Sequence, residues 1–213
     1  MKLLLTSAGF TNEDLKKAFL NLLDRPTNTL SVVIIPTAKN RNANDKRVFL
    51  RTMKFYDEQN FKVIDFVDVA AIEKKYWLPR LKSADVIHVC GGNTYYLLDQ
   101  IRKSGLDGEL KDLLESRIYV GDSAGSILVT PSIDVAMVDE GDENIVGINN
   151  TTGLSLVDFE VSPHTPGDVS LNANKEYSAS IKNKLYAYDD NTAIKIDGDS
   201  FEFVGTGQHW EYN

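Results

Sequence analysis

The chain has 213 residues, 42% of them hydrophobic, and carries a net charge of −8 with an isoelectric point near 4.9. This acidic balance argues against a nucleic-acid partner, which requires a basic face, and no apolar stretch reaches the ~20 residues that cross a membrane. The apolar run at residues 3–5 is too short for a signal peptide, and Cys90 is the single cysteine. A cytoplasmic protein without disulfides is therefore expected.

Up to residue 130, short apolar runs alternate with longer amphipathic stretches, which is typical of β-α-β units around a parallel sheet. Strands are predicted at residues 3–5, 32–35, 63–67, 86–90 and 118–120. Helices are predicted at residues 11–24, 45–59, 95–103 and 107–116, with another inside 71–82 that Pro79 disturbs. Thr11 is the expected cap of the first of these helices.

After Pro131 the pattern changes to runs in which apolar and polar residues often alternate. Strands are predicted at residues 133–138, 156–161, 185–188, 193–196 and 201–204, and one helix at residues 171–183. This half is expected to add antiparallel strands to the sheet. Because no linker or internal repeat is present, the prediction is one α/β domain over residues 1–213, built as a three-layer, doubly wound, mostly parallel sheet.

The most informative segment is Gly121-Asp122-Ser123-Ala124-Gly125, which follows a predicted strand and precedes an apolar segment at residues 127–129. A serine flanked by small residues at a strand-to-helix turn is the nucleophile-elbow pattern. The turn is tight, so only small neighbours fit, and it directs the first backbone N–H of the helix toward developing oxyanion charge. Ser123 is therefore the candidate nucleophile.

A second glycine signal, Gly91-Gly92-Asn93-Thr94, follows the predicted strand at residues 86–90. Ligands of open α/β sheets bind at the carboxyl ends of the strands. The backbone N–H groups of this turn are candidates for an oxyanion hole, and Asn93 or Thr94 is equally a candidate helix cap. The two roles are compatible.

A serine nucleophile needs a base, and the chain has three histidines. His88 lies inside an apolar strand and is expected to be structural. His164 lies between two prolines after an apolar run, in a rigid loop suited to presenting an imidazole, although a solvated loop histidine fits the same pattern. His209, near the end of the sequence, is expected at the surface or on a strand edge.

The third member of such a triad is a carboxylate that orients the imidazole. Asp190 follows the predicted strand at residues 185–188, and Asp134 and Asp139 are alternatives downstream of the elbow. The sequence leaves the choice open, because an aspartate in a turn is often only a turn former.

Other chemistries find less support. Cys90 ends a buried strand and is expected to be a small core residue rather than a rival nucleophile. The sequence has no paired His or Cys motif with metal-ligand spacing, no phosphate loop ending in Gly-Lys-Ser/Thr, and no Gly-x-Gly-x-x-Gly after its first strand. Neither a metal nor a cofactor is therefore expected.

The order of these motifs resembles the dipeptidase E and cyanophycinase family of serine peptidases. The likeness rests on the Gly91-Gly92-Asn93-Thr94 turn, the elbow around Ser123, the Ser162-Pro163-His164 segment, the opening strand and the Pro36-Thr37-Ala38 turn, and so spans almost the whole chain.

The resemblance implies a class I glutamine-amidotransferase-like fold with serine where relatives of that wider group carry cysteine. It implies Ser123 as nucleophile, His164 as base, and the backbone of Gly92 and Ala124 as oxyanion donors. It also favours Asp190 as the third member, although the family more often has glutamate there.

Family members cleave peptide bonds next to aspartate, in dipeptides or in an aspartate–arginine polymer. The resemblance therefore implies small peptides as substrates, with aspartyl dipeptides among the candidates. Arginine is the best partner for an aspartyl side chain, yet none follows Arg117, and Lys175 is the positive charge considered in its place. Aspartyl specificity stays open, whereas peptide hydrolysis through an acyl-enzyme is the expected activity.

Two other functions stay open at this point. An esterase of the α/β-hydrolase type has the chain order serine, acid, histidine, which Ser123, Asp190 and His209 satisfy. A catalytically silent binding protein would keep the elbow as a structural turn. No nucleic-acid or membrane partner is expected, and the sequence leaves a homodimer open.

Overall fold

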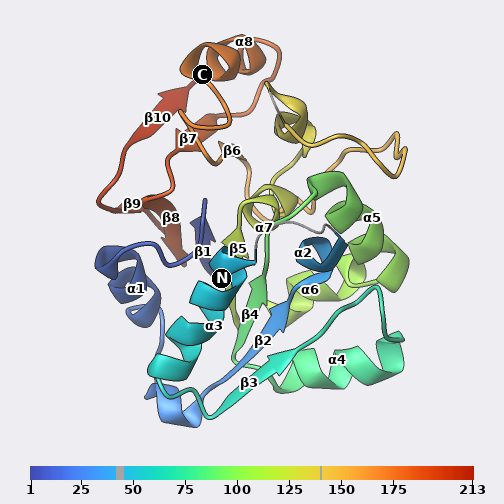
Figure 1. The fold of residues 1–213 in the computed structure, drawn as a ribbon, viewed down its shortest axis with the longest axis vertical. Helices are drawn as coiled ribbons and strands as arrows, with labels where there is room; N and C mark the ends of the chain where they lie inside the picture. The colour runs from blue at the N-terminus through green and yellow to red at the C-terminus, as the bar shows by residue number, and fades with distance from the viewer. Residues whose placement is uncertain (42–45, 140) are drawn as a thin grey trace.

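The described residues, 1–41, 46–139 and 141–213 of a computed structural model, contain a seven-stranded sheet in the order β3-β2-β4-β5-β1-β8-β9. Five strands pair in parallel: β1 (Lys2–Thr6), β2 (Ser31–Ile35), β3 (Val63–Phe66), β4 (Val86–Val89) and β5 (Ile118–Asp122). β8 (Thr192–Asp197) and β9 (Ser200–Gly205) extend the sheet by antiparallel pairing beside β1. This mostly parallel sheet with antiparallel additions confirms the predicted fold class (Figure 1).

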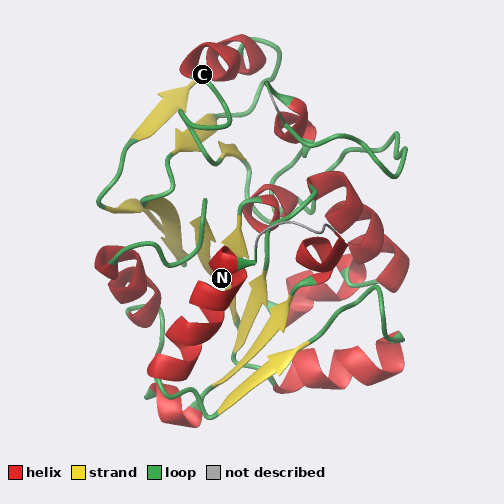
Figure 2. Ribbon diagram, viewed as in Figure 1, coloured by secondary structure: helices red, strands yellow, loops and turns green. Residues whose placement is uncertain are grey.

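The described residues also form a three-stranded sheet, in the order β10-β7-β6. Its strands are β6 (Glu160–Ser162), β7 (Leu185–Tyr188) and β10 (His209–Tyr212). β6 and β7 are parallel, whereas β10 pairs antiparallel with β7. This sheet and α8 (Leu171–Ser178) lie together at one end of the molecule (Figure 2).

Alternation along the strands of the large sheet creates an apolar core on each of its faces. Leu3 and Leu5 of β1 contribute to one core, and Leu4 contributes to the other. The first core is covered by α4 (Lys74–Ser83), α5 (Thr94–Ser104), α6 (Asp107–Leu113) and α7 (Ala124–Leu128). The second is covered by α1 (Glu13–Leu20) and α3 (Arg47–Glu58). Burial on both faces explains why β1, β2, β4 and β5 read as nearly continuous apolar runs, whereas β3, at the edge of the sheet, is partly exposed.

Three expected elements of the second half differ from the structure. The expected strand at residues 133–138 is wrong, because the 3₁₀ helix η2 (Asp134–Met137) occupies this segment. The Ser132 hydroxyl accepts the Asp134 N–H at 3.1 Å, and this local bond favours a turn over an extended strand. The expected strand at residues 156–161 begins only at Glu160, and the expected helix at residues 171–183 ends at Ser178.

The first half differs mainly at element boundaries. Asn12 rather than Thr11 caps α1, because its side chain accepts two backbone N–H groups of the first turn. The expected start of the second long helix, residue 45, lies outside the described residues. Two short elements, η1 (Thr27–Thr29) and α2 (Thr37–Arg41), flank β2. Within the described segments, no helix combines the length and apolar character needed to cross a bilayer.

Candidate active site

Three neighbouring strands, in the order β4-β5-β1, end at one edge of the large sheet. Their chain continuations carry Gly91, Ser123 and Ser7. A pocket of about 370 Å³ at this edge is lined by all three of these residues together with Gly92 and His164. Its position is the one at which open α/β sheets bind ligands.

Ser123 occupies a strained turn between β5 and α7. Its φ of 49° and ψ of −109° lie outside the regions that residues with a Cβ ordinarily adopt. Its N–H donates to the Thr6 carbonyl at 2.9 Å, which ties the turn to β1. A Cβ on Gly121 would lie 2.7 Å from Gly125 backbone atoms, and one on Gly125 would lie 2.2 Å from the Val89 carbonyl oxygen. The crossing of strand and helix therefore requires both glycines.

His164 lies between Ser123 and Asp190. Its Nε2 is 2.9 Å from Ser123 Oγ, and its Nδ1 is 2.7 Å from Asp190 Oδ1. His164 follows β6 and Asp190 follows β7, and because these strands are parallel neighbours their loops leave at the same edge. The His164 backbone is also left-handed, with φ of 61°. The structure thus brings together three side chains that are far apart in the sequence.

Ser7, which was not among the predicted site residues, joins this group. Its hydroxyl donates to Asp190 Oδ1 at 2.6 Å and lies 3.0 Å from His164 Nδ1. It also accepts the His164 backbone N–H at 2.8 Å. The sequence places Ser7 directly after the first strand, which is the one signal that could have identified it. The sequence does not indicate, however, that this strand lies beside β5.

The pKa values of this group are shifted by their mutual contacts. Burial lowers the pKa of His164, but the hydrogen bond and charge of Asp190, with the charges of Asp168 and Asp142, outweigh burial and hold it above its ordinary value. The hydrogen bond from His164 lowers the pKa of Asp190, and the bond from Ser7 lowers it further against the effect of burial. Asp190 therefore keeps its negative charge beside the ring.

The alternative carboxylates lie in other arrangements. Asp139 accepts the Ser170 N–H at 2.7 Å, which ties it to the start of α8. Asp134 begins η2. Among the described residues neither forms a hydrogen bond with His164, so the geometry favours Asp190 over both.

In the described parts of the chain, neither of the other two histidines forms a hydrogen bond with Ser123. His88 is fully buried, as expected of a structural histidine, and its Nδ1 lies 2.9 Å from the Tyr56 hydroxyl. His209 stacks on Phe203 with ring centroids 3.6 Å apart. It has no hydrogen bond to Ser123 among the described residues, so the serine, acid and histidine order of an α/β-hydrolase esterase is not formed through it.

The glycine turn after β4 is constrained by close backbone approach. Gly92 has φ of 145°, and a Cβ there would lie 2.5 Å from the Ala38 carbonyl group. A Cβ on Gly91 would lie 3.0 Å from Ser123 Cβ. Asn93 caps α5, because its Oδ1 accepts the Tyr96 N–H at 2.9 Å. The cap fixes the turn, and Gly91 leaves room beside the serine.

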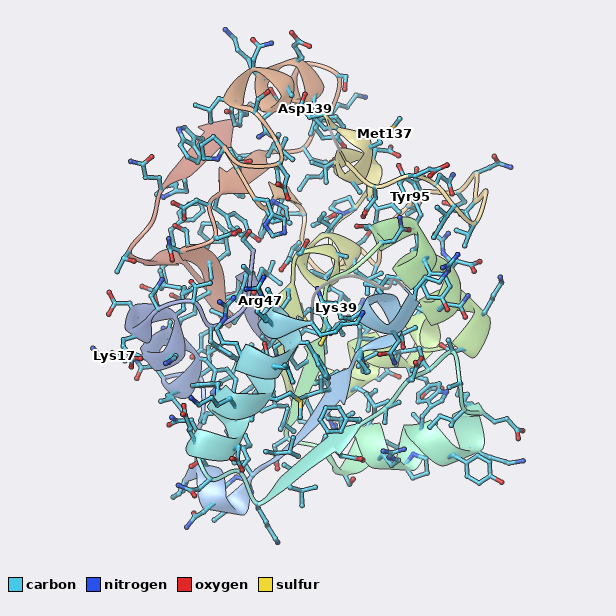
Figure 3. All side chains as sticks on the ribbon, viewed as in Figure 1. Lys17, Lys39, Arg47, Tyr95, Met137 and Asp139 are labelled. Carbon is cyan, nitrogen blue, oxygen red and sulfur yellow. The ribbon has the colours of Figure 1, made fainter. Side chains whose placement is uncertain are left out.

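Charged side chains of both signs line the pocket. Lys39 of α2 supplies a positive charge, and Asp142 and Asp168 supply negative charges. Asp142 is held in place by the Thr94 N–H at 2.7 Å and the Thr94 hydroxyl at 2.6 Å. Lys39 is half-buried and Lys17 of α1 is exposed; in the view of Figure 3, Lys39 lies near the middle of the outline and Lys17 at its edge.

Lys175, the basic residue considered from the sequence, is exposed on α8 and is not among the described residues that line the pocket. Lys39 was not among the predicted site residues, because only the second half of the chain was considered as the source of a positive charge. The lysine lies instead on the short helix that follows β2.

A strained serine, an imidazole and a carboxylate in line at the carboxyl edge of an α/β sheet are the features of a serine hydrolase. The sequence profile of "Peptidase family S51" matches residues 3–204. The chain therefore belongs to peptidase family S51. This assignment confirms the resemblance read from the sequence and makes the protein a peptidase, a hydrolase of the serine type.

Two relatives agree with this assignment, and a solved structure agrees with the fold. The uncharacterized peptidase Lmo0363 of Listeria monocytogenes is 28% identical over 173 residues, covering 79% of this chain and 82% of the relative. A peptidase E of Escherichia coli is 33% identical over 85 residues, covering 39% of this chain and 35% of the relative. A crystal structure described as a peptidase E protein of L. monocytogenes EGD-e superposes with a TM-score of 0.81 at 24% identity, covering 96% of this chain and 98% of that chain. The superposition confirms the fold.

Proposed function

We propose that Ser123 is the nucleophile of this peptidase, His164 its general base and acid, and Asp190 the carboxylate that orients the ring. The observation that carries the proposal is the continuous line of contacts, 2.9 Å from Ser123 Oγ to His164 Nε2 and 2.7 Å from His164 Nδ1 to Asp190 Oδ1. With Nδ1–H donated to Asp190, Nε2 carries the lone pair that accepts the serine proton.

The reaction then proceeds through a covalent ester. Ser123 Oγ bonds to the carbonyl carbon of the peptide while His164 Nε2 takes its proton. The tetrahedral intermediate breaks its C–N bond as Nε2 returns the proton to the leaving amine. A water molecule, deprotonated by the same nitrogen, attacks the ester carbon and releases the acid product and free Ser123. No cofactor takes part in these steps.

The backbone N–H groups of Gly92 and Ala124 are the proposed oxyanion donors. Each belongs to a turn at the same edge of the sheet, and Ala124 directly follows the nucleophile. Neither N–H donates to another acceptor among the described residues, which leaves both available for a developing oxyanion. Removing one such donor ordinarily lowers kcat by about 10²–10³.

We propose a small peptide with a free terminus as substrate. At about 370 Å³ the pocket is at the small end of ligand sites. Lys39 suits a carboxylate, so aspartyl dipeptides stay among the candidates, although lysine lacks the planar fork of arginine. Asp142 and Asp168 suit an ammonium group. The single cysteine of the chain is consistent with the reducing cytoplasm, which we propose as its location.

The test combines a covalent probe with substitution. A fluorophosphonate should label the native protein at Ser123, as mapped by mass spectrometry of the modified peptide. Ser123→Ala should lose the label and lower turnover of a dipeptide panel by about 10⁴–10⁶. Ser180→Ala, which removes an exposed hydroxyl after α8, is the matched control and should keep both. A folded Ser123→Ala protein with undiminished peptidase activity would rule out the assignment.

A further inference from the structure

We propose that His88, Cys90 and Asp122 form a binding site for a divalent metal ion with the ligand preferences of zinc. Their donor atoms lie within 4.8 Å of one another, and all three side chains are buried. Ligand atoms that share one zinc ion lie about 3–4 Å apart. His88 Nε2 and Asp122 Oδ2, at 2.9 Å, would move slightly apart, and separations near the 4.8 Å limit would shorten by about 1 Å. Three protein ligands drawn from nitrogen, sulfur and oxygen leave a fourth position for water or another ligand.

The parallel register of the sheet explains how these residues meet. His88 and Cys90 are two positions apart along extended backbone, so their side chains point to the same face of the sheet. His88 pairs with Val120 of the neighbouring strand β5. The same register places Cys90 beside Asp122. Sequence spacing gave no sign of this cluster, because its ligands come from two different strands.

The strongest indication of a ligand is the unsatisfied nitrogen of His88. The side chain is fully buried, and its Nε2 has no hydrogen-bond partner among the described residues. Nε2 lies 2.9 Å from Asp122 Oδ2, a contact with the length of a hydrogen bond but not its direction. A buried polar atom left in this state is destabilising. A cation between Nε2 and Oδ2 would satisfy both.

The outer partners of the cluster orient it for a metal. The Tyr56 hydroxyl lies 2.9 Å from His88 Nδ1, and Nδ1–H donated to that hydroxyl leaves Nε2 with its lone pair facing the cluster. The Thr6 hydroxyl donates to Asp122 Oδ1 at 2.8 Å, which leaves Oδ2 for the ion. Bonds of this kind hold metal-ligating imidazoles and carboxylates in place.

The charge of the three ligands and their position beside the pocket also suit a divalent cation. A thiolate, a carboxylate and a neutral imidazole balance a divalent cation, so the occupied site is neutral in the core. As the sulfur–metal bond forms, the Cys90 thiol proton passes to solvent. Cys90 and Asp122 line the same pocket as Ser123, so an ion reaches the site from the peptide-binding side.

Cobalt is the probe, because a thiolate bound to Co²⁺ gives an intense near-ultraviolet absorption that other protein ligands do not. Cys90 is the single cysteine of the chain, so this band reports one site only. Titration of reduced, metal-free, full-length protein with Co²⁺ should give the band at one ion per chain, and added Zn²⁺ should remove it. Tyr56→Phe should weaken cobalt binding about 10- to 100-fold.

The controls separate this site from the catalytic one. Cys90→Ser should lose the band, whereas His164→Ala, which removes the imidazole beside Ser123, should keep it. Circular dichroism verifies that each variant is folded. Wild-type protein that develops no band would overturn the proposal without any variant, and the cluster would then be a metal-free polar contact. A band unchanged in folded His88→Gln and Asp122→Asn proteins would overturn it as well.

Discussion

The Ser7 hydroxyl donates to Asp190 Oδ1 at 2.6 Å, and this carboxylate oxygen of Asp190 lies 2.7 Å from His164 Nδ1. Ser7 also accepts the His164 backbone N–H at 2.8 Å. The hydroxyl of the residue that follows β1 therefore bridges the His164 backbone and the Asp190 carboxylate. Ser7 thus links the loop after β6 to the loop after β7.

Ser7→Ala should lower kcat about 10- to 100-fold with little change in KM, because small displacements of reacting groups slow the chemical step more than they weaken binding. Steady-state kinetics on one dipeptide measures both constants. The matched control is Thr11→Val, since the Thr11 hydroxyl donates to the Asp190 carbonyl at 2.7 Å and not to its carboxylate. Equal losses in the two variants would show that general loop stability, rather than orientation of the ring, explains the effect.

The carboxylate itself is tested by Asp190→Asn. This change keeps the shape of the side chain but removes the charge that fixes the Nδ1–H tautomer of His164, so kcat should fall by about 10³–10⁴. Asp190→Glu should retain part of the activity, because a longer side chain still offers a carboxylate. Asp139→Asn, which removes an alternative carboxylate, should have little effect. If Asp139→Asn lowered kcat more than Asp190→Asn did, Asp139 and not Asp190 would be the third member of the triad.

Activity should increase with pH as His164 becomes neutral, since only the neutral ring accepts a proton. The pKa of His164 is raised, so the acid limb of kcat/KM should lie above about 6.5, the ordinary value for histidine. Asp168→Asn removes one of the charges that raise it, and the limb should therefore move to lower pH. Asp199→Asn, in the turn between β8 and β9, is the control for overall charge. A limb that moves equally in both variants, or upward in Asp168→Asn, would contradict the electrostatic explanation.

Much of the fold follows from local patterns in the sequence. Strands buried on both faces give apolar runs such as residues 32–35, and these runs lie within the observed strands. The elbow around Ser123 is recognisable because its glycines are required by contacts only a few residues away or on the adjacent strand. The strand expected at residues 133–138 is wrong, because the apolar residues of this segment pack from a 3₁₀ helix.

The complete site was less predictable, because it depends on strand order. The triad candidates were named from residue chemistry, but their meeting requires β6 and β7 to be parallel neighbours. Ser7 directly follows β1 and Lys39 lies on the helix after β2, and no catalytic motif in the sequence includes either residue. Nothing local to a residue reveals which strands will lie beside its own.

The last prediction concerns the turn after β4. Gly92→Ala introduces a Cβ 2.5 Å from the Ala38 carbonyl group at a φ of 145°, a conformation that side chains rarely adopt. Backbone strain and overpacking together should lower the free energy of unfolding by about 2–5 kcal/mol. Peptidase activity should also fall, because the Gly92 N–H would move away from the oxyanion.

Gly108→Ala is the matched control for that prediction. Gly108 lies in α6, and a Cβ there meets nothing within 4 Å. Alanine has the better helix propensity, so this variant should be more stable by about 0.5–1 kcal/mol and fully active. Urea unfolding of both variants gives the two free energies directly. If Gly92→Ala were as stable and active as Gly108→Ala, the close approach of Gly92 to Ala38 would have no part in shaping the site.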